Sequence, residues 1–179
     1  MRKILFYTIC LIISGLQAQD VTIPWSSSYK LSWNDFKGPI DKNSEAVATT
    51  ASGITFGYSL KMKGQSVEGF TTTVKTYFYP EKSWYKPNQV DENVLAHEQF
   101  HFNITELFAR KFRKEIAGLK VSNTIKKSLN TLHKCINKDL AAMQKRYDAE
   151  TNYSINKALQ NKWQLFIAEE LNRLEPYSH

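Results

Sequence analysis

The stretch His97-Glu98-Gln99-Phe100-His101 decides how the second half of the chain folds. Around it, apolar residues and both histidines recur at three- and four-residue intervals, which is typical of the inner face of a helix. The members of this face are Val90, Val94, His97, His101, Ile104 and Phe108. Asn88 is a suitable N-cap and Gly118 is a suitable stop, so the pattern predicts one helix over residues 89–117.

The spacing of the two histidines favours a metal site. Residues four apart on a helix point in nearly the same direction, so the rings of His97 and His101 can reach one divalent ion. Glu98 lies one step round the helix, too far off axis for a natural ligand but close enough to take a proton from a metal-bound water. Two buried histidines with ordinary polar partners would give the same pattern. A metal ion, however, supplies one partner to both rings.

The residues before the motif predict strands. Residues 29–36 alternate apolar and polar side chains and predict a short strand that ends before Gly38. Residues 46–62 and 66–79 are rich in Thr, Val, Phe and Tyr and are joined by Lys63-Gly64-Gln65, so they predict a long hairpin. We expect this hairpin to pack on the motif helix and to leave one edge strand beside the histidines, where an extended peptide can bind.

The residues after the motif predict two more helices. Apolar side chains from Ile125 to Tyr147 form one helical stripe, and a further apolar segment spans residues 154–174. The expected fold class is α+β, with an N-terminal β-hairpin or small antiparallel sheet packed on a C-terminal bundle of about three helices, in a zincin-like arrangement. Cys135 is expected to be a buried, inert thiol. Three tryptophans are expected to fill the core: Trp33, Trp84 and Trp163.

The N-terminus has the pattern of a secretory signal peptide. Arg2 and Lys3 precede an apolar run and a cleavage site near Ala18, and the run is too short to span a membrane. We therefore expect residues 1–18 to be removed. Residues 19–179 are expected to form one domain in the periplasm or outside the cell, with no membrane span.

The chain is basic, with a net charge of +7 that becomes about +5 once Arg2 and Lys3 are removed. Its lysines and arginines are spread over helical faces with acidic residues between them, and no aromatic residues are interleaved. This pattern is typical of solvated helix faces, so we expect no nucleic-acid partner.

Two histidines leave the metal site one protein ligand short, because zinc hydrolases normally use three ligands and keep a fourth position for water. Glu106 points away from the motif histidines on the helix and is expected to pair with Arg110 or Arg113 on the outer face. His133 and Asp148, further along the chain, are weaker candidates for the third ligand.

Five segments resemble a secreted bacterial family of unknown function whose members are described as predicted zinc-dependent proteases: LSWNDFKG (31–38), SW (83–84), LAHEQFHF (95–102), ELFAR (106–110) and YDAET (147–151). In that family a Tyr-Asp-x-x-Thr-x-His segment supplies the presumed third ligand, and this chain has Tyr153 at the matching position. Tyrosine binds zinc through its phenolate oxygen and is a weaker ligand than imidazole at neutral pH. If the second and third helices are continuous, Glu150 faces the histidines instead.

These observations lead to one leading expectation and one alternative. The leading expectation is an exported zinc-dependent hydrolase, a peptidase, with Zn²⁺ bound by His97, His101 and Tyr153 and with Glu98 as general base. Its substrate would be a peptide or protein. The alternative is a non-catalytic envelope protein for binding or assembly, in which the metal site has degenerated.

Overall fold

The computed structural model describes residues 21–178, so the signal peptide predicted over residues 1–18 lies outside the described residues. Within the described part, the chain has the predicted α+β class, with small antiparallel sheets and three helices. None of these helices is both long and apolar enough to cross a membrane. The strands are β1 (Ile23–Pro24), β2 (Ala48–Thr49), β3 (Ser52–Lys63), β4 (Ser66–Phe78) and β5 (Trp84–Tyr85). The helices are α1 (Glu92–Ala117), α2 (Ile125–Thr151) and α3 (Lys157–Arg173).

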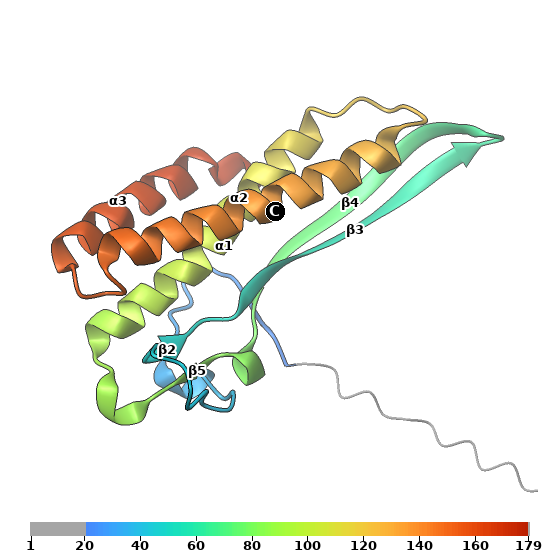
Figure 1. Ribbon diagram of the computed structural model, residues 1–179. Helices are drawn as coiled ribbons and strands as arrows, with labels where there is room; N and C mark the ends of the chain where they lie inside the picture. Colours follow the sequence, from blue (N-terminus) through green and yellow to red (C-terminus); the bar gives the residue numbers. More distant parts are fainter. Residues whose placement is uncertain (1–20, 179) are drawn as a thin grey trace, which may run out of the picture.

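β3 and β4 form a long hairpin, as predicted, but its first strand begins at Ser52 rather than at residue 46, because Ala48 and Thr49 pair with β5 instead. Their register runs from Ser52 opposite Phe78 to Lys63 opposite Ser66, and Gly64 supplies the left-handed turn residue with φ 59°. β1 pairs with the end of β4, so the strand order is β1-β4-β3 and β3 is the outer strand, while β2 and β5 form a separate two-stranded sheet. The hairpin lies along the helices and extends past them at its turn (Figure 1).

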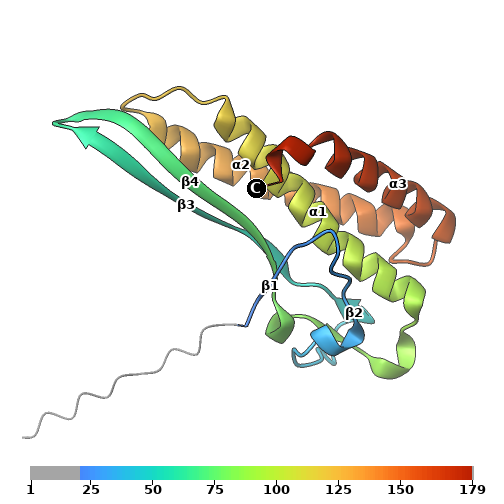
Figure 2. The same cartoon turned by 180° about the vertical axis from the view of Figure 1, so that it is seen from behind.

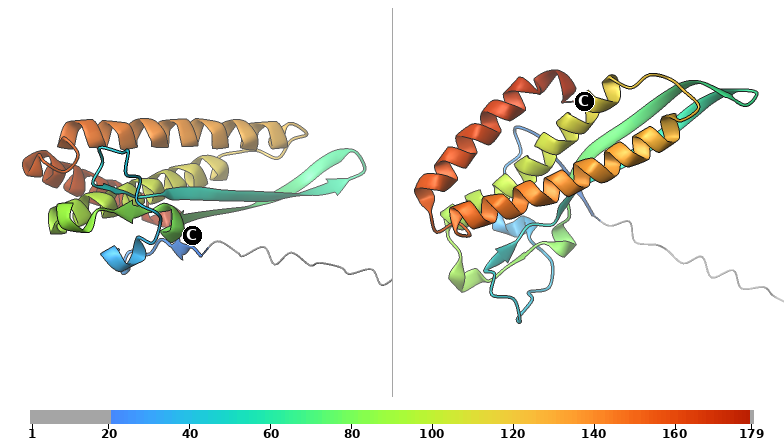
Figure 3. Two further views of the ribbon diagram at one scale, coloured as in Figure 1. Left: turned by 60° about the horizontal axis from the view of Figure 1, so that its bottom comes forward. Right: turned by 45° about the horizontal axis from the view of Figure 1, so that its top comes forward.

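The main core lies between the inner face of the hairpin and the three helices. α1 contacts both hairpin strands, as predicted, and it also contacts α2 and α3. Figure 2 shows β1 beside β4 on the opposite side of the molecule from α2, and Figure 3 shows α2 running along α1. Side chains from all three helices are fully buried in this core, among them Ile104, Leu107, Phe112, Leu129, Tyr147 and Ile167.

A second, smaller core joins the N-terminal segment to the start of α1. Its buried members are Leu31, Phe36, Phe78 and Phe102. Trp33 lies at the edge of this core, half-buried and stacked on Tyr85 with 4.6 Å between ring centroids. Trp84 and Trp163 are buried, as predicted.

The prediction of a strand over residues 29–36 is wrong. This segment forms a short 3₁₀ helix at Trp33–Asp35 instead. The carboxylate of Asp35 accepts hydrogen bonds from the backbone N–H of Ser32 (2.7 Å) and from its hydroxyl (3.0 Å). These local side-chain bonds replace the pairing that a strand would need.

α1 begins at Glu92 rather than at residue 89. Pro87–Gln89 form a 3₁₀ turn, and the N-cap is therefore Asp91, whose carboxylate accepts a hydrogen bond from the backbone N–H of Val94 (2.9 Å). The helix ends before Gly118, as predicted.

α2 and α3 are two helices separated by a tight turn. Asn152, Tyr153 and Ser154 follow α2 with positive φ angles of 48°, 52° and 76°, and the chain reverses there. Asn156 then caps α3 by accepting a hydrogen bond from the backbone N–H of Leu159 (3.1 Å). The continuous helix that would direct Glu150 at the histidines is therefore not formed.

Two predictions about side-chain burial are wrong. Cys135 is exposed, because it lies one helical step outside the apolar stripe of α2. Glu106 is buried, because β4 and the C-terminal segment cover this side of α1. Its pairing with Arg110 (3.0 Å) and Arg113 (3.1 Å) is as predicted, and the hydroxyl of Thr76 in β4 donates a further hydrogen bond to it (2.7 Å).

Candidate metal centre

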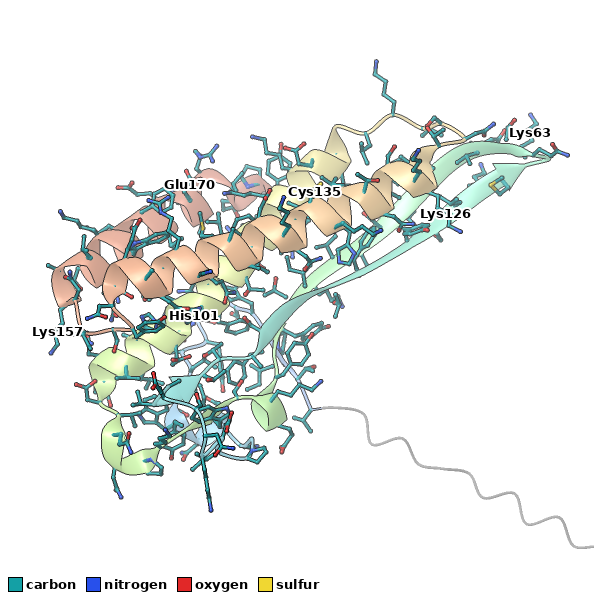
Figure 4. The ribbon with its side chains drawn as sticks, viewed as in Figure 1. Lys63, His101, Lys126, Cys135, Lys157 and Glu170 are labelled. Carbon is teal, nitrogen blue, oxygen red and sulfur yellow. The ribbon has the colours of Figure 1, made fainter. Side chains whose placement is uncertain are left out.

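Three potential metal ligands converge where α1 packs against the C-terminal end of α2. The Nε2 atoms of His97 and His101 lie 3.2 Å apart, and Asp148 Oδ1 lies 3.0 Å from the first and 2.8 Å from the second. Both imidazoles are buried, whereas 28% of the Asp148 side chain is exposed, so solvent reaches the cluster from the Asp148 side. Figure 4 shows His101 on α1 beside the end of α2. This group of residues could hold a metal ion.

Helix geometry explains why these side chains meet. His97 and His101 are four residues apart on α1, and Gln144 and Asp148 are four residues apart on α2, so each pair occupies one helix face. The two helices pack side by side in opposite directions (Figure 1). Gln144 therefore meets His101, and Asp148 reaches both histidines.

A glutamine contacts the other nitrogen of each imidazole. Gln160 Oε1 of α3 lies 3.2 Å from His97 Nδ1, and Gln144 Oε1 of α2 lies 3.0 Å from His101 Nδ1. The nitrogen end of each amide is bonded as well. Gln160 Nε2 donates to the backbone carbonyl of Asn93 (3.0 Å), and Gln144 Nε2 donates to a threonine hydroxyl of α1 (3.1 Å). Partners at both ends fix which way each amide points.

Tyr147 and Glu98 complete the surroundings of the histidines. The Tyr147 ring stacks on His97, with 4.4 Å between centroids and 14° between planes, and meets His101 edge-on at 5.3 Å. Glu98 is buried, and its backbone carbonyl accepts a hydrogen bond from the hydroxyl of Thr50 (3.2 Å). In the part of the chain that the structure describes, two buried side-chain oxygens lack a hydrogen-bond partner, and they are Tyr147 Oη and Glu98 Oε2. Both oxygens belong to residues that surround the histidines, and such buried oxygens can accept a further polar group.

The ionisable groups of the cluster shift one another's pKa. Burial opposes the charged form of Asp148, but its hydrogen bonds with His101 and His97 outweigh burial and hold the pKa of Asp148 well below its ordinary value. Burial alone would lower the pKa of His101, but Asp148 and the charge of Glu98 raise it overall. Burial and the same two carboxylates raise the pKa of Tyr147, which therefore stays a neutral phenol. The cluster favours positive charge beside Asp148.

The structure does not bring Tyr153 to the histidines. Because α2 keeps its helical course to Thr151 and then reverses, the Tyr153 side chain lies on the turn and is 68% exposed. Glu150 accepts a hydrogen bond from the indole N–H of Trp163 (2.8 Å), and His133 stacks against core aromatic rings. The carboxylate that lies beside both histidines belongs to Asp148.

The sequence contains only part of the signal for this arrangement. Gln144 and Asp148 have the same four-residue spacing as the two histidines, but polar pairs at this spacing are also common on exposed helix faces. Gln160 gives no signal, because its place beside His97 depends on how the turn after α2 directs α3.

No curated protein and no solved structure matches this chain. Residues 30–157 match a family model, and the matched region is most of the chain. It contains His97, Glu98, His101 and Asp148. The chain therefore belongs to the family described as bacterial protein of unknown function (DUF922).

Proposed function

We propose that this protein is an exported zinc-dependent hydrolase that cleaves peptides. In this proposal His97, His101 and Asp148 hold the metal, and Glu98 accepts and returns a proton. The observation that carries the proposal is the convergence of the two Nε2 atoms and Asp148 Oδ1 at one point between α1 and α2.

The amide oxygens of Gln160 and Gln144 can only accept hydrogen bonds. Each therefore requires a hydrogen on the Nδ1 atom that faces it, which leaves Nε2 of the neutral ring with a lone pair. The two Nε2 atoms and Asp148 Oδ1 lie within 3.2 Å of one another. Three electron-rich atoms at this distance repel one another unless a proton or a cation lies among them. If the two histidines had only ordinary core partners, nothing would require both lone pairs to point at one carboxylate.

The donor set fits zinc, which binds imidazole nitrogen and carboxylate oxygen in four-coordinate sites. With zinc–ligand distances of about 2.0–2.2 Å, the ligand atoms of a tetrahedral site lie roughly 3.3–3.6 Å apart. The observed separations of 2.8 to 3.2 Å therefore require only a small outward movement of the three side chains. Three protein ligands leave one position for water or substrate.

Glu98 is suited to proton transfer at this site. Bound zinc would lower the pKa of a coordinated water and polarise a scissile carbonyl. Glu98 follows His97 directly on α1, and its Oε2 is buried with no hydrogen-bond donor from residues 21–178, so no donor in that part of the chain competes for this oxygen. The hydroxyl of Thr50 holds the backbone at Glu98, and Tyr147 holds the ring of His97 by stacking.

The outer edge of β3 supports a peptide as substrate. Ser52, the first residue of β3, shares a hydrogen bond with Thr105 of α1 (2.7 Å), one turn after His101. Within the described chain β3 has a neighbouring strand on one side, and the backbone groups of its other edge are not paired in a sheet. An extended peptide can add to such an edge through main-chain hydrogen bonds.

The metal content of the purified full-length protein tests the centre first. After a chelator-free preparation supplemented with zinc, we expect about one equivalent of zinc per chain. Less than about a tenth of an equivalent would overturn the proposal, because a site with this donor set binds zinc once its ligands are deprotonated.

Glu98→Gln tests the catalytic role, since it keeps the shape of the side chain and removes the basic oxygen. We expect hydrolysis of an unfolded protein substrate to fall by about 10²- to 10⁴-fold while zinc remains bound. Glu115→Gln is the matched control, because Glu115 is an exposed residue of the same helix. Equal activity of Glu98→Gln and wild type would remove Glu98 from the mechanism.

A non-catalytic metal-binding protein of the envelope is the second candidate. The tight burial of the site favours it, because His97 is 3% exposed and Glu98 is 5% exposed, which limits the room for a substrate. This candidate predicts that wild type retains zinc but cleaves none of a mixture of unfolded substrates. Detectable cleavage that is lost in Glu98→Gln decides for the hydrolase.

A further inference from the structure

α3 lies almost wholly outside the matched family region, which ends at residue 157. One of its side chains nevertheless reaches the candidate metal centre, since Gln160 is 1% exposed and its Oε1 lies 3.2 Å from His97 Nδ1. We propose that Gln160 is a positioning residue of the metal centre, which holds a hydrogen on His97 Nδ1 and so directs Nε2 of that ring at Asp148. The part of this inference that concerns metal binding rests on the proposed function.

The direction of the Gln160 amide is fixed from its far end. Its Nε2 donates to two acceptors of one residue, the backbone carbonyl of Asn93 (3.0 Å) and Asn93 Oδ1 (3.1 Å). A flipped amide would place its oxygen against both of these oxygens and would lose both bonds. Oε1 must therefore face His97, and because Oε1 can only accept, the hydrogen must lie on His97 Nδ1.

Asn93 is itself held in one orientation. Its Nδ2 donates to the backbone carbonyl of Ser154 (2.7 Å), which leaves Oδ1 as the acceptor for Gln160. The hydrogen bonds thus run without a break from Ser154 through Asn93 and Gln160 to His97. A chain of this kind restricts a metal ligand to one ring orientation and one tautomer.

The same chain of hydrogen bonds ends at the unusual turn between α2 and α3. Asn152, Tyr153 and Ser154 are consecutive residues other than glycine in left-handed conformation, which is strained for a residue such as tyrosine. Strain of this kind persists where the surrounding structure determines it. Here the turn brings α3 back against α1, and the bond from Asn93 to Ser154 fixes it there.

The test compares Gln160→Met with wild type in the full-length chain. Methionine keeps the length of the side chain and the helix propensity but removes the acceptor oxygen. Gln164→Met is the matched control, because Gln164 lies one turn further on α3, is half-buried and has a side chain that makes no hydrogen bond within the described residues.

The first readout is the NMR signal of the His97 ring nitrogens in chelator-treated protein at pH about 8, above the ordinary pKa of histidine. We expect a hydrogen on Nδ1 in wild type and in Gln164→Met, and its loss or exchange to Nε2 in Gln160→Met. This readout needs no metal, so it stands whatever the outcome for the proposed function. A wild-type ring with a bare Nδ1 overturns the inference, and this result does not depend on the folding of any variant.

The second readout is zinc affinity, measured by competition with a chromogenic chelator. We expect Gln160→Met to bind zinc about 10- to 100-fold more weakly than wild type and Gln164→Met to match wild type. If wild type binds zinc and Gln160→Met binds it equally well, the inference is overturned while the metal centre stands. If wild type binds no zinc, the proposed function fails, and the tautomer measurement alone decides the role of Gln160.

Discussion

Asp148 of α2 contacts both histidines of α1, so the candidate site lies between two helices. Its Oδ1 lies within 3.0 Å of both Nε2 atoms, and its partial exposure gives solvent access to the cluster. Without metal, protons lie in the hydrogen bonds between this carboxylate and the imidazole nitrogens, and these bonds lower the pKa of Asp148 and raise that of His101. A metal ion would replace these protons, so metal and protons compete for the oxygen of Asp148. The residue that serves as third ligand therefore also sets how metal binding depends on pH.

Three residues have a side-chain oxygen that could be the third ligand, and substituting each in turn tests which one it is. They are Asp148, Tyr153 and Glu150. We expect Asp148→Asn to weaken zinc binding by more than about 100-fold, since loss of a ligand should exceed the roughly 10- to 100-fold cost of losing a neighbouring hydrogen bond. Tyr153→Phe and Glu150→Gln should bind like wild type. Asp139→Asn, at an exposed site of α2, is the control. Weaker binding by Tyr153→Phe in a competition titration would return the ligand role to the tyrosine.

The stability of the chelator-treated protein should depend on pH through the same pair. The pKa of folded His101 is raised above 6.5, so the stability that it contributes is present below about pH 6.5 and is lost as pH rises through the folded pKa. The pKa of folded Asp148 is depressed below 3.8, so its contribution is present above about pH 4 and is lost as pH falls further. The free energy of unfolding by urea, measured across this pH range, shows both the alkaline and the acid loss of stability. The alkaline decline should shrink in Asp148→Asn, and an unchanged decline would contradict this assignment.

Loop segments outside the helices and strands hold α1, which carries the motif from His97 to His101, in position. The backbone N–H of Leu31 donates to Gln99 Oε1 (2.7 Å), so the N-terminal segment is tied to the second half of the motif. Gly38 joins the same segment to the residue before β5, because its N–H donates to the carbonyl of Ser83 (2.8 Å). The hydroxyl of Ser83 in turn accepts a hydrogen bond from the N–H of Ala51, directly before β3 (2.9 Å). The start of the outer strand and the motif helix are thus held by one set of bonds.

Gly38→Ala should therefore loosen this region. A Cβ atom at Gly38 would lie 2.8 Å from the carbonyl oxygen of Glu81 and 2.9 Å from that of Ser83, so backbone has to move. We expect the free energy of unfolding to fall by about 1–3 kcal/mol. Gly57→Ala is the control, because a Cβ there meets nothing within 4 Å, and it should be neutral or stabilise by up to about 1 kcal/mol. Equal unfolding midpoints for the two variants would show that the close approach carries no cost.

At the scale of the whole molecule, the candidate site joins all three helices. The ligands come from α1 and α2, and the glutamine behind His97 comes from α3. The hairpin covers the other side of α1, so the helices meet the sheet on one side and one another at the candidate metal centre. A bound metal would therefore stabilise the tertiary arrangement of the helices rather than any one helix.

Zinc should raise the thermal stability of the whole domain cooperatively. A ligand that binds only the folded chain, at a free concentration of about 100 times its Kd, adds about 2.7 kcal/mol to the free energy of unfolding. For a domain of this size, this corresponds to an increase of roughly 5–10 °C in Tm. Calorimetry with zinc and with chelator measures the difference. Asp148→Asn should show almost no shift. A shift of the same size in that variant would mean that zinc binds elsewhere.

The sequence by itself determined the features that depend on neighbours in the chain. The spacing of His97 and His101 places both rings on one face of α1, the alternating residues of β3 and β4 make a hairpin, and the apolar stripes make α2 and α3. These features follow from helical and strand periodicity, which is a local property. The same reasoning failed at residues 29–36, where the side chain of Asp35 bonds to Ser32 and prevents a strand.

Only the tertiary structure decided which side chains complete the site. Asp148 becomes a candidate ligand because α2 packs beside α1 in one register, and Tyr153 lies exposed on the turn because the chain reverses after Thr151. Gln160 reaches His97 only because this reversal returns α3 to α1. Packing between distant segments fixes these contacts. The spacing of polar residues in the sequence does not show whether another helix, a metal ion or water will contact them.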